Sequence, residues 1–588
     1  MINQENYSEV LYIDLSNKKF WIKNRKDLFD KYIGGTGVAT QLLHEECPVN
    51  TDSLGADNPI IFAVGPFTGV YPFASKTIAM FKSPHTGDLG ESHAGGRSAI
   101  AMKMAGYGAI VIKGKSDMPI YLVIKKRRVE FRNANTLWGM KSAFTVGDVI
   151  RANESDPGMR TIMRIGLAGE KMVSYAAVVT ETYRHFGRLG LGAVFGSKML
   201  KGLMVSGKKN IEVANKKEYI KTYKEIYDKA VDSPVMKKYH DLGTAGNIKA
   251  LNMLGALPTN NLQSATFANS EEISGEHIAE NFLGRRVACS HCPTGCIHLA
   301  VLREPYDDEP YFYKTTMVGY DYELIYALGS MVGLSDTEEM LKLIDLVETY
   351  CLDAMSTGVV LSWATEAMQK KMITTEETDN INIQFGNLKA YMDVVDRIIS
   401  QPNDFYKALA KGADFAARKY GGLDFSLTFG KNEMAGYHTG AVGYLGFTIG
   451  ARHSHLDNAG YSIDQNEMIN TTPTPKEVVD KLIKEESLRQ ILSSITICFF
   501  ARGIYNLDVI SKALLSVGIE ITPDELMLKG REILKEKYRF KIREGFAFEK
   551  LNIPHRIFEL KAPAGMIDEQ FFNEALAYAK VQLIDSIL

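Results

Sequence analysis

The sequence has few cysteines, no long apolar run and almost no net charge, and each shortage excludes a class of protein. Only six cysteines occur in 588 residues, and half of them lie in one short stretch, which does not fit a secreted disulfide framework. No apolar run reaches the ~18 residues that a membrane span requires. The 68 basic and 70 acidic residues leave a net charge of −2, so nothing favours a nucleic acid or an anionic membrane as partner.

Other familiar signals are also missing. The first residues, Met1-Ile-Asn-Gln-Glu-Asn, contain no basic and apolar signal sequence, so we expect a cytoplasmic protein in a reducing compartment. There is no P-loop, dinucleotide fingerprint, internal repeat or low-complexity segment. What is present is length and apolar content: 588 residues at 45% hydrophobic suffice for about three domains.

The residue pattern changes near residue 207 from one typical of strands to one typical of helices. Before it, short apolar runs bounded by turns are typical of strands; they cover 10–14, 59–64, 109–113, 119–124 and 202–206. After it, long helical patterns follow, with helix-start signals at Ser335–Glu338, Thr474–Glu477 and Thr522–Glu525. We therefore expect an α+β fold: a β-sheet domain over 1–207, a mostly helical domain over 208–415 and a second over 416–588. The second boundary rests on the turn-rich stretch at 419–423.

Three cysteines dominate the middle of the chain, in Cys289-Ser-His-Cys-Pro-Thr-Gly-Cys296. Thiolates at these spacings converge on one centre when the proline and glycine between them let the backbone curl. A fourth ligand must come from elsewhere, and the candidates are Cys47, Cys351, Cys498, His291 and His298. An iron-sulfur cluster wants four thiolates, whereas structural zinc accepts an imidazole. The single C-x2-C knuckle favours the cluster over zinc or metal-free thiols.

Glycine-rich turns are the other local signal. Gly34–Gly37 and Gly95–Arg97 suit close approach of the backbone to a phosphate or a polar ring. Ordinary turns have the same composition, so both interpretations stay open.

Taken together, the motifs of the chain resemble the aldehyde ferredoxin oxidoreductase family, tungsten enzymes with a bis-pterin metal centre beside a 4Fe-4S cluster. The resemblance covers essentially the whole length. Its motifs are Tyr32-Ile-Gly-Gly-Thr-Gly37, Gly65-Pro-Phe-Thr-Gly69, Arg188-Leu-Gly-Leu-Gly-Ala-Val-Phe-Gly-Ser-Lys198, the cysteine stretch, Asp321-Tyr-Glu323, Leu352-Asp-Ala-Met-Ser-Thr-Gly358 and the segment ending in Cys498. The family fold implies that the sheet domain carries the pterins.

The resemblance assigns cofactor residues in the first domain. Lys76, where the family pattern has arginine, and Arg184 match phosphate-binding positions. A Mg2+ ion between the pterin phosphates is expected on the backbone carbonyls of His93 and His185, where changed side chains matter little. The rest of the expected first-domain set lies beside these residues: Ala94, Gly95, Gly96, Gly187 and Arg188. On residue type alone, solvated surface charge would be the favoured interpretation of Lys76 and Arg184.

Two copies of a pterin motif are expected further on. The first places Glu348, Leu352 and Asp353 at the pterin rings, with glutamate for the family aspartate and Cys351 for its glycine. The second places Ser493 and Ile497 there and ends in Cys498 as the fourth cluster thiolate, with Ser493 for aspartate and Thr496 for glycine. Carboxylates accept hydrogen bonds from ring N–H groups, so Ser493 weakens this chemistry. These departures indicate a divergent member.

The matching catalytic segment is Asp321-Tyr322-Glu323, with Glu323 as base or proton donor, its pKa raised. A plain ion pair with a lysine or arginine is the alternative for Glu323. The family histidine aligns with Gly443, so His438 is the first substitute and His455 the second, with His453 nearby. A buried histidine donating to a carbonyl is the alternative here.

The resemblance therefore implies oxidation of an aldehyde to the carboxylic acid, with tungsten or molybdenum, and electrons passed through the cluster to ferredoxin or an iron-sulfur subunit. A reductive complex acting on a carboxylate or an aromatic acyl thioester is the second hypothesis, motivated by Gly443 and Cys351. A non-enzymatic zinc or iron-sulfur scaffold is the third. We also expect an oligomer.

Overall fold

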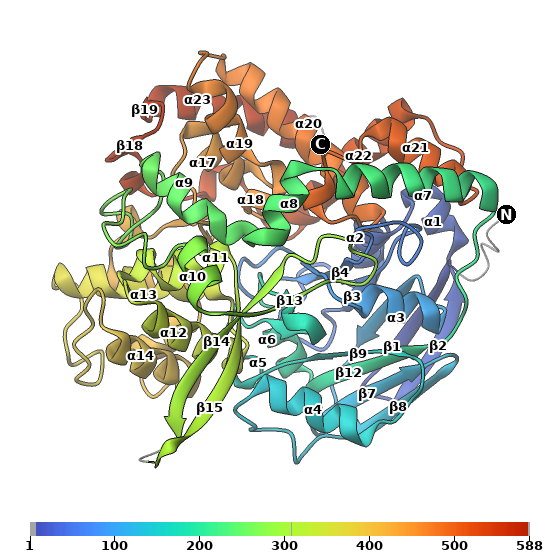
Figure 1. The fold of residues 1–588 in the computed structure, drawn as a ribbon, viewed down its shortest axis with the longest axis horizontal. Coiled ribbons are helices and arrows are strands. Elements are labelled where there is room, and N and C mark those ends of the chain that lie inside the picture. Colours follow the sequence, from blue (N-terminus) through green and yellow to red (C-terminus); the bar gives the residue numbers. More distant parts are fainter. Residues whose placement is uncertain (1–6, 307–308, 586–588) are drawn as a thin grey trace.

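The computed structural model describes residues 7–306 and 309–585. It is 46% helical and 17% strand, with strands gathered in the first 207 residues and helices dominating the rest (Figure 1). The predicted α+β class, a sheet-built N-terminal region followed by helix-rich regions, is confirmed. None of the described helices combines the length and the apolar content needed to cross a bilayer.

The first sheet has six strands in the order β2-β1-β6-β3-β4-β5, antiparallel except between β1 and β6. The bounds are β1 Glu9–Asp14, β2 Lys19–Asn24, β3 Ile60–Ala63, β4 Thr77–Lys82, β5 Leu89–Ala94 and β6 Ala109–Lys113. Three of the predicted strands, at 10–14, 59–64 and 109–113, are therefore present.

The second sheet also has six strands, in the order β11-β10-β9-β12-β7-β8. The bounds are β7 Ile120–Lys125, β8 Arg128–Asn133, β9 Met159–Arg164, β10 Val178–Val179, β11 His185–Phe186 and β12 Leu200–Gly207. The remaining two predicted strands are β7 and β12.

The first sheet is buried on both faces because alternate side chains of its strands enter two different cores. Leu11 and Ile13 of β1 pack in one core with Leu122 of β7 and residues of two helices, α3 Ser98–Ala105 and α6 Leu191–Ser197. Val10 and Tyr12 point the other way, toward α2 Gly35–Glu46 and the helical part of the chain. Burial on both faces explains why these strands read as unbroken apolar runs.

The remaining helices divide into three small ones in the first 207 residues and a larger later group. The early ones are α1 Lys26–Tyr32, α4 Ala143–Asn153 and α5 Leu167–Glu170. The later ones are α7 Lys216–Val231, α8 Pro234–Asp241, α9 Asn247–Met253, α10 Gly275–Asn281, α11 Tyr322–Leu328, α12 Thr337–Tyr350, α13 Ala354–Gln369, α14 Leu388–Ser400, α15 Asp404–Leu409, α16 Ala413–Tyr420, α17 Ala441–Ile449, α18 His455–Asn458, α19 Gly460–Ile463, α20 Pro475–Ser494, α21 Leu507–Ser516, α22 Pro523–Arg543 and α23 Glu569–Lys580.

Two of the three predicted helix starts are correct. Thr474 and Thr522 each cap a helix through a reciprocal bond with the glutamate three residues on, with proline at the first helical position. The third is one residue off, since Asp336 rather than Ser335 accepts the N–H bond that caps α12.

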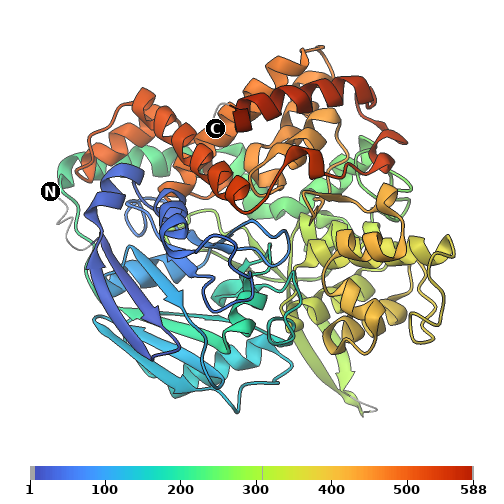
Figure 2. The same ribbon diagram turned by 180° about the vertical axis from the view of Figure 1, so that it is seen from behind.

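A three-stranded antiparallel sheet interrupts the helical region and was not predicted. It consists of β13 Leu283–Val287, β14 Ile297–Tyr306 and β15 Glu309–Tyr320. β14 and β15 form a long ribbon whose far end projects from the molecule in both views (Figures 1 and 2). The ribbon begins one residue after Cys296 and ends one residue before Asp321, and His298 pairs with Tyr320 at its base. It therefore brings the cysteine stretch and the predicted catalytic segment together.

The predicted domain division stays a prediction. β12 ends at Gly207 and α7 begins at Lys216, but Ile226 of α7 packs in one core with Ile510 of α21. Residue 415 lies inside α16, whereas the glycines at 421 and 422 follow that helix.

Two further pairs of short strands lie in the last part of the chain: β16 Thr428–Phe429 with β17 Asn432–Glu433, and β18 Lys561–Ala562 with β19 Gly565–Met566.

Candidate functional site

Two backbone hydrogen bonds through one residue join Cys498 to the cysteine loop, residues 289–296. The N–H of Phe73 donates to the carbonyl oxygen of His291 (3.0 Å), and the N–H of Cys498 donates to the carbonyl oxygen of Phe73 (3.1 Å). Phe73 has a φ of 65°, a conformation that its side chain disfavours and that its surroundings must hold. The fourth predicted thiolate therefore lies beside the other three.

The four thiols influence one another's ionisation. Burial, followed by the charge of Cys289, raises the pKa of Cys292 to about 11, and Cys498 adds to the effect. Burial also raises the pKa of Cys296 to about 12, against the lowering effect of the Arg184 guanidinium. Ionising all four thiols near neutral pH would therefore require a positively charged centre among them.

The other candidates for the fourth ligand are engaged elsewhere. Both ring nitrogens of His298 contact backbone carbonyl oxygens, those of Cys296 (3.1 Å) and His240 (3.0 Å). Cys47 and Cys351 are buried in separate apolar cores, and the His291 side chain is exposed. Across the described ranges, no three His, Cys, Asp or Glu side chains are arranged around a single metal ion.

Gly95 lies where two basic side chains meet the cysteine loop. A Cβ built on it would stand 2.8 Å from Sγ of Cys289, 3.7 Å from Nζ of Lys76 and 3.8 Å from Cγ of Arg184. The ammonium of Lys76 and the aliphatic stem of Arg184 therefore border this bare backbone, and two basic side chains so placed suit an anion such as a phosphate. The structure thus brings together three predicted cofactor residues and one predicted cluster ligand.

β5 and β11, which carry the two predicted Mg2+ carbonyls, lie against each other. The N–H of Arg188, just after β11, donates to Oγ of Ser92 on β5 (3.4 Å). Burial lowers the pKa of His93 to about 4, although its Nε2 lies 2.7 Å from Glu91, and lowers that of His185 to about 3. Both rings are neutral near pH 7, so neither side chain adds positive charge there.

The small residues around these strands fit the same site. Ala94 is the last residue of β5, and Gly96 follows with φ of 94° while its carbonyl oxygen accepts the N–H of Ser290 (2.9 Å). A Cβ on Gly187 would meet no atom within 4 Å. Open space and a direct tie to the cysteine loop therefore flank the basic residues.

Arg188 and Asp353 belong to a buried polar network that sequence reasoning found only in part. Nε of Arg188 donates to Oδ2 of Asp353 (3.1 Å), whose Oδ2 also accepts from Ser356 (2.6 Å). Ser356 lies equally close to Oε2 of Glu433, which contacts Nε2 of His85 (2.8 Å). Nη1 of Arg188 is buried without a hydrogen-bond partner among the described residues. That free donor is available to a bound group.

Glu348 faces the same region from α12. Burial, with the charges of Asp321 and Asp345, raises its pKa to about 8. Its Oε1 lies 3.9 Å from Nε2 of His185, which is beyond hydrogen-bonding range and leaves that nitrogen without a partner in the described structure. No described residue donates a hydrogen bond to Glu348, and with a pKa of about 8 the group is largely protonated near pH 7, so it can both donate to and accept from a ligand.

The second copy of the motif is mainly backbone and apolar surface. Leu352 of the first copy forms an isolated bridge with Ala176. In the second copy, Ile497 is buried, and the carbonyl oxygen of Ser493 accepts the N–H of Thr496 (3.2 Å). A Cβ on Gly35 would stand 2.1 Å from that carbonyl oxygen. The close approach at Gly34–Gly37 is therefore to the chain's own backbone, and the ligand interpretation of that turn is not supported.

Cys351 and Thr496, which replace glycines of the family pattern, both have left-handed backbone. Their φ angles are 63° and 65°, and a β-branched residue such as threonine rarely adopts this conformation. Sγ of Cys351 donates to the carbonyl oxygen of Ala177 (3.3 Å) in a small apolar core. Cys351 is thus a buried packing residue at a strained turn.

Glu323 pairs with His455. Nε2 of His455 lies 3.3 Å from Oε1 of Glu323, and the hydroxyl of Tyr437 donates to the same oxygen (3.1 Å). Burial raises the pKa of Glu323, but the contacts from His455 and Tyr437 outweigh it and hold that pKa below its ordinary value. The expected raised pKa is wrong for Glu323. The carboxylate with a raised pKa is instead Asp321, whose pKa rises to about 6 because of burial and the charge of Glu323.

His438, the first choice of histidine, is directed elsewhere. Its Nδ1 lies 2.7 Å from the hydroxyl of Tyr444, and burial lowers its pKa to about 4. The N–H of Gly443 donates to Asp464 (2.7 Å) at the start of α17, and Nδ1 of His453 contacts the carbonyl oxygen of Phe447. The structure brings His455, the second choice, to Glu323. The alignment of the family histidine with Gly443 stays a prediction.

Tyr322, although next to Glu323 in sequence, has its hydroxyl engaged by the carbonyl oxygen of Gly436. Its ring packs against that of Tyr437, with centroids 5.0 Å apart, and Tyr437 stacks on Tyr461 at 4.5 Å. Tyr437 was missed by sequence reasoning because no motif contains it.

Comparisons with known proteins agree along the whole chain. The family model described as "Aldehyde ferredoxin oxidoreductase, N-terminal domain" matches residues 10–207, and that described as "Aldehyde ferredoxin oxidoreductase, domains 2 & 3" matches residues 221–580. The chain is 30% identical to the tungsten-containing aldehyde ferredoxin oxidoreductases of Thermococcus kodakarensis, over 581 residues, and Pyrococcus furiosus, over 583; each alignment covers 95% of this chain and 93% of the relative.

Two further likenesses concern proteins with other printed activities. An aliphatic sulfonate oxidoreductase, WOR-like subunit, of Pyrococcus furiosus is 30% identical over 432 residues, 70% of this chain and 67% of that protein. The solved active site complex BamBC of benzoyl coenzyme A reductase with 1,5 dienoyl-CoA superposes with a TM-score of 0.83 at 21% identity, covering 98% of this chain and 94% of that one. At this identity the latter likeness concerns the fold alone.

Proposed function

Because the chain belongs to the aldehyde ferredoxin oxidoreductase family, we propose that it oxidises an aldehyde to the carboxylic acid as a tungsten-dependent enzyme. The reaction consumes one water and releases two electrons and two protons per aldehyde. The observation that carries the proposal is the Glu323–His455 pair, at 3.3 Å. Arg184 lies within electrostatic range of both the cysteines and the catalytic segment. Burial lowers its pKa, but the charges of Cys296, Cys289, Asp321 and Cys498 outweigh it and raise that pKa.

The residues present fit the bis-pterin group that this chemistry requires. Lys76 and Arg184 beside Gly95 would hold phosphate, and the backbone carbonyls of His93 and His185 would bind the Mg2+. Further contacts would come from the buried Nη1 of Arg188 and from the carboxylate of Glu348. When bound, the metal-pterin group would supply the two-electron redox chemistry and the site of oxygen transfer.

The four cysteines support a 4Fe-4S cluster over structural zinc. Zinc would require ligands gathered around one ion, and the described residues contain no such group, although the thiols lie within electrostatic reach of one another. A cuboidal cluster takes four thiolates spread around a larger body, which suits Cys289, Cys292, Cys296 and Cys498.

Glu323 acts as the base in this proposal. Since its pKa is held below the ordinary value, the carboxylate is ionised near neutral pH and accepts a proton from the attacking water. His455, at the same oxygen, and the hydroxyl of Tyr437 hold the carboxylate in place and stabilise its charge before the proton arrives.

The reductive alternative loses both features that motivated it. In this proposal His455 would take the role for which Gly443 has no side chain, and Cys351 packs against the backbone of Ala177. Aldehyde oxidation is therefore better supported than reduction of a carboxylate or an acyl thioester. Molybdenum in place of tungsten would leave the roles of these side chains unchanged.

Electrons leave through the cysteine loop in this proposal. Ala288, His291 and Pro293 are exposed, so the cluster would lie near the surface, within reach of ferredoxin or an iron-sulfur partner subunit. A single cluster relays one electron at a time, and an external carrier must therefore take both in turn.

The direct test is anaerobic purification with metal analysis and an aldehyde-dependent dye assay. We expect tungsten or molybdenum, about four irons per chain, viologen reduction on addition of aldehydes, and one oxygen from labelled water in the acid. Active protein containing neither tungsten nor molybdenum would reject the proposal. Acyl-thioester reduction without aldehyde oxidation would favour the reductive alternative.

A further inference from the structure

The ring of His455 is oriented without the usual help. Its Nε2 contacts Glu323, but its Nδ1 is buried and has no hydrogen-bond partner among the residues described. Catalytic histidines are ordinarily held by a bond from the second ring nitrogen. The direction of this ring therefore depends on the backbone that carries it, residues 451–458, which we call the histidine loop.

Asp457 holds the histidine loop together from inside. Its Oδ2 accepts the backbone N–H groups of Arg452 (2.9 Å) and Ser454 (3.0 Å), and its Oδ1 accepts Nε of Arg452 (2.6 Å). The aspartate is only 3% exposed. A Cβ on Gly450 would stand 2.5 Å from Oδ2, so the preceding turn is built around this carboxylate. His455 lies within the segment that these bonds close.

Helix α20 grips the histidine loop at three further points. Oε1 of Glu486 accepts the N–H of Ala451 (2.9 Å), and Oε2 of the same residue accepts from the side chain of Asn458 (3.3 Å). Nη1 of Arg489 donates to the carbonyl oxygen of Leu456 (2.7 Å), while its guanidinium lies over the ring of Phe499, next to Cys498. The helix that carries the histidine loop thus leads directly to the fourth cysteine.

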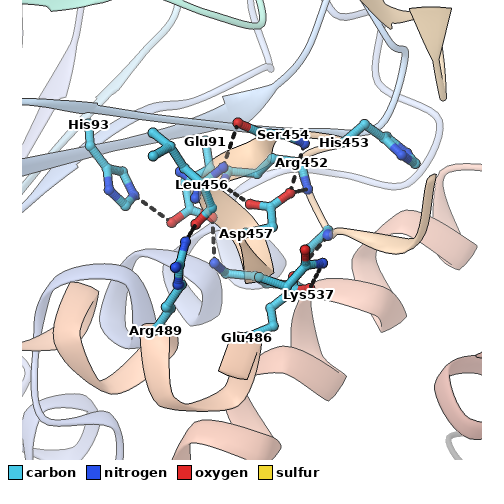
Figure 3. A network of polar contacts seen from close by, with 12 residues as sticks. Glu91, His93, Arg452, His453, Ser454, Leu456, Asp457, Glu486, Arg489 and Lys537 are labelled. Atoms are coloured by element: carbon cyan, nitrogen blue, oxygen red, sulfur yellow. Dashed lines mark hydrogen bonds and ion pairs between the residues drawn. The ribbon is translucent and has the colours of Figure 1, made fainter. Parts of the chain in front are cut away.

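The contacts of Asp457, which we call the clamp, belong to a buried charge network that joins the histidine loop to β5 and α22 (Figure 3). Burial lowers the pKa of Arg452, but the charges of Asp457 and Glu91 outweigh it and keep the guanidinium charged. Lys537 of α22 pairs with Glu91, which also contacts His93. Because each charge has a partner, the loop cannot shift without uncovering a buried charge, which is costly.

We propose that Asp457 is a positioning residue that sets His455 against Glu323. The inference rests on the proposed function, because the Glu323–His455 pair is its reacting centre. Asp457 touches neither residue's reacting atoms and acts through the backbone of the histidine loop. A misplacement of about 1 Å at such a pair costs up to about 100-fold in rate.

Asp457→Asn is the sharpest test, since it keeps the shape of the side chain and removes its charge. An NH2 group in place of Oδ2 would lose the bonds from the backbone N–H groups of Arg452 and Ser454, and one in place of Oδ1 would lose the bond from Nε of Arg452. Either placement sets donor against donor. We expect kcat for aldehyde-dependent dye reduction to fall about 10- to 100-fold while KM and the tungsten and iron contents stay unchanged. The matched control is Glu366→Gln, which weakens another buried carboxylate–arginine pair, with Arg556, and should leave kcat intact.

Crystal structures provide the readout that does not depend on turnover. In Asp457→Asn we expect the distance between Nε2 of His455 and Oε1 of Glu323 to exceed about 3.5 Å, the limit of a hydrogen bond. An unchanged distance, or wild-type kcat, overturns the inference, as does an equal loss of kcat in Glu366→Gln. Should Asp457→Asn fail to fold, Arg452→Lys decides: a several-fold loss of kcat supports the clamp, and none rejects it. Wild-type protein without aldehyde turnover would count against the proposed function, whereas the distance tests Asp457 alone.

Discussion

His455 reaches Glu323 across 132 residues of sequence and places Nε2 3.3 Å from Oε1. The two side chains come from α18 and α11, and the hydroxyl of Tyr437 completes the contact. A carboxylate held in this way is ready to accept a proton.

Glu323→Gln removes the base while keeping the shape of the side chain. We expect kcat for aldehyde oxidation to fall about 100-fold or more, the usual contribution of a positioned base. His455→Asn should also lower kcat, while His438→Asn should leave it near wild type, because His438 contacts Tyr444 instead. Steady-state rates with a viologen dye measure this. If His438→Asn were the damaging histidine variant, the assignment of His455 would fail.

Cys498→Ser removes the distant thiolate of the cluster. We expect the iron content to drop from about four per chain and the brown absorbance to disappear, with tungsten content measured alongside. The control is Cys351→Ala, which removes a buried thiol that donates to the carbonyl oxygen of Ala177, and this variant should retain iron. Full iron in Cys498→Ser, or stoichiometric zinc in the wild type, would contradict the cluster.

Gly95→Ala introduces a methyl group where a Cβ would lie 2.8 Å from Sγ of Cys289. Since the cysteine loop or the basic pair must shift, we expect a large loss of extractable pterin, measured by fluorescence after oxidation. Gly503→Ala is the control, because a Cβ there meets no atom within 4 Å. Equal pterin content in both variants would show that Gly95 does not border the cofactor.

The pH dependence of stability should carry a signature of Glu433. Burial raises its pKa, but the charge of His85 and bonds from His85 and Ser356 outweigh it and lower it from 4.5 to about 2. A carboxylate with a depressed folded pKa contributes stability above its unfolded pKa, and that stability is lost as the pH falls through the folded one. We therefore expect the free energy of unfolding to fall between pH 4.5 and about 2.

Glu433→Gln should remove about 3 kcal/mol at pH 7 and flatten that part of the profile. Urea titrations over a pH series measure it, with the exposed Glu569→Gln as control. A profile that is as steep in Glu433→Gln as in the wild type would refute this account.

Electron transfer to a protein partner should depend on the basic rim of the cysteine loop. Arg285 and Arg286 are exposed on β13, and Arg286 donates to the carbonyl oxygen of Asp241, next to His240, which contacts the loop at Thr294. We expect the double change Arg285→Glu and Arg286→Glu to slow reduction of an acidic ferredoxin several-fold at low salt, as rim charges govern association. Viologen reduction should be unaffected.

The matched control for that surface is Lys389→Glu, a charge reversal on α14, whose side chain is 85% exposed. Stopped-flow rates of ferredoxin reduction, measured at low and at high salt, compare the double variant with Lys389→Glu. Equal slowing by Lys389→Glu, or none in the double variant, would place the electron exit elsewhere.

Sequence patterns predicted what depends on local spacing. The apolar runs at 10–14 and 109–113 are strands, and Thr474 and Thr522 cap helices, because each signal lies within a few residues of its effect. Ser335 was one residue off because Asp336, also a good cap, follows it.

Contacts made only by tertiary packing were beyond that reasoning. The meeting of His455 with Glu323 and that of His85 with Glu433 join segments far apart in the chain, and neither residue of the second pair lies in a motif. The lowered pKa of Glu323 follows from its neighbours and not from its own sequence context. The β14–β15 ribbon was missed because its strands lie within a region that otherwise reads as helical.

That ribbon has a practical consequence. Its paired base connects the cysteine loop to the segment that carries Glu323, whereas Tyr306 and Phe312, in its outer part, are largely exposed. Lengthening or tagging the outer strands should leave turnover intact, as exposed tips commonly tolerate insertion. A tether attached there would fix the molecule to an electrode without disturbing the cysteines or the Glu323–His455 pair.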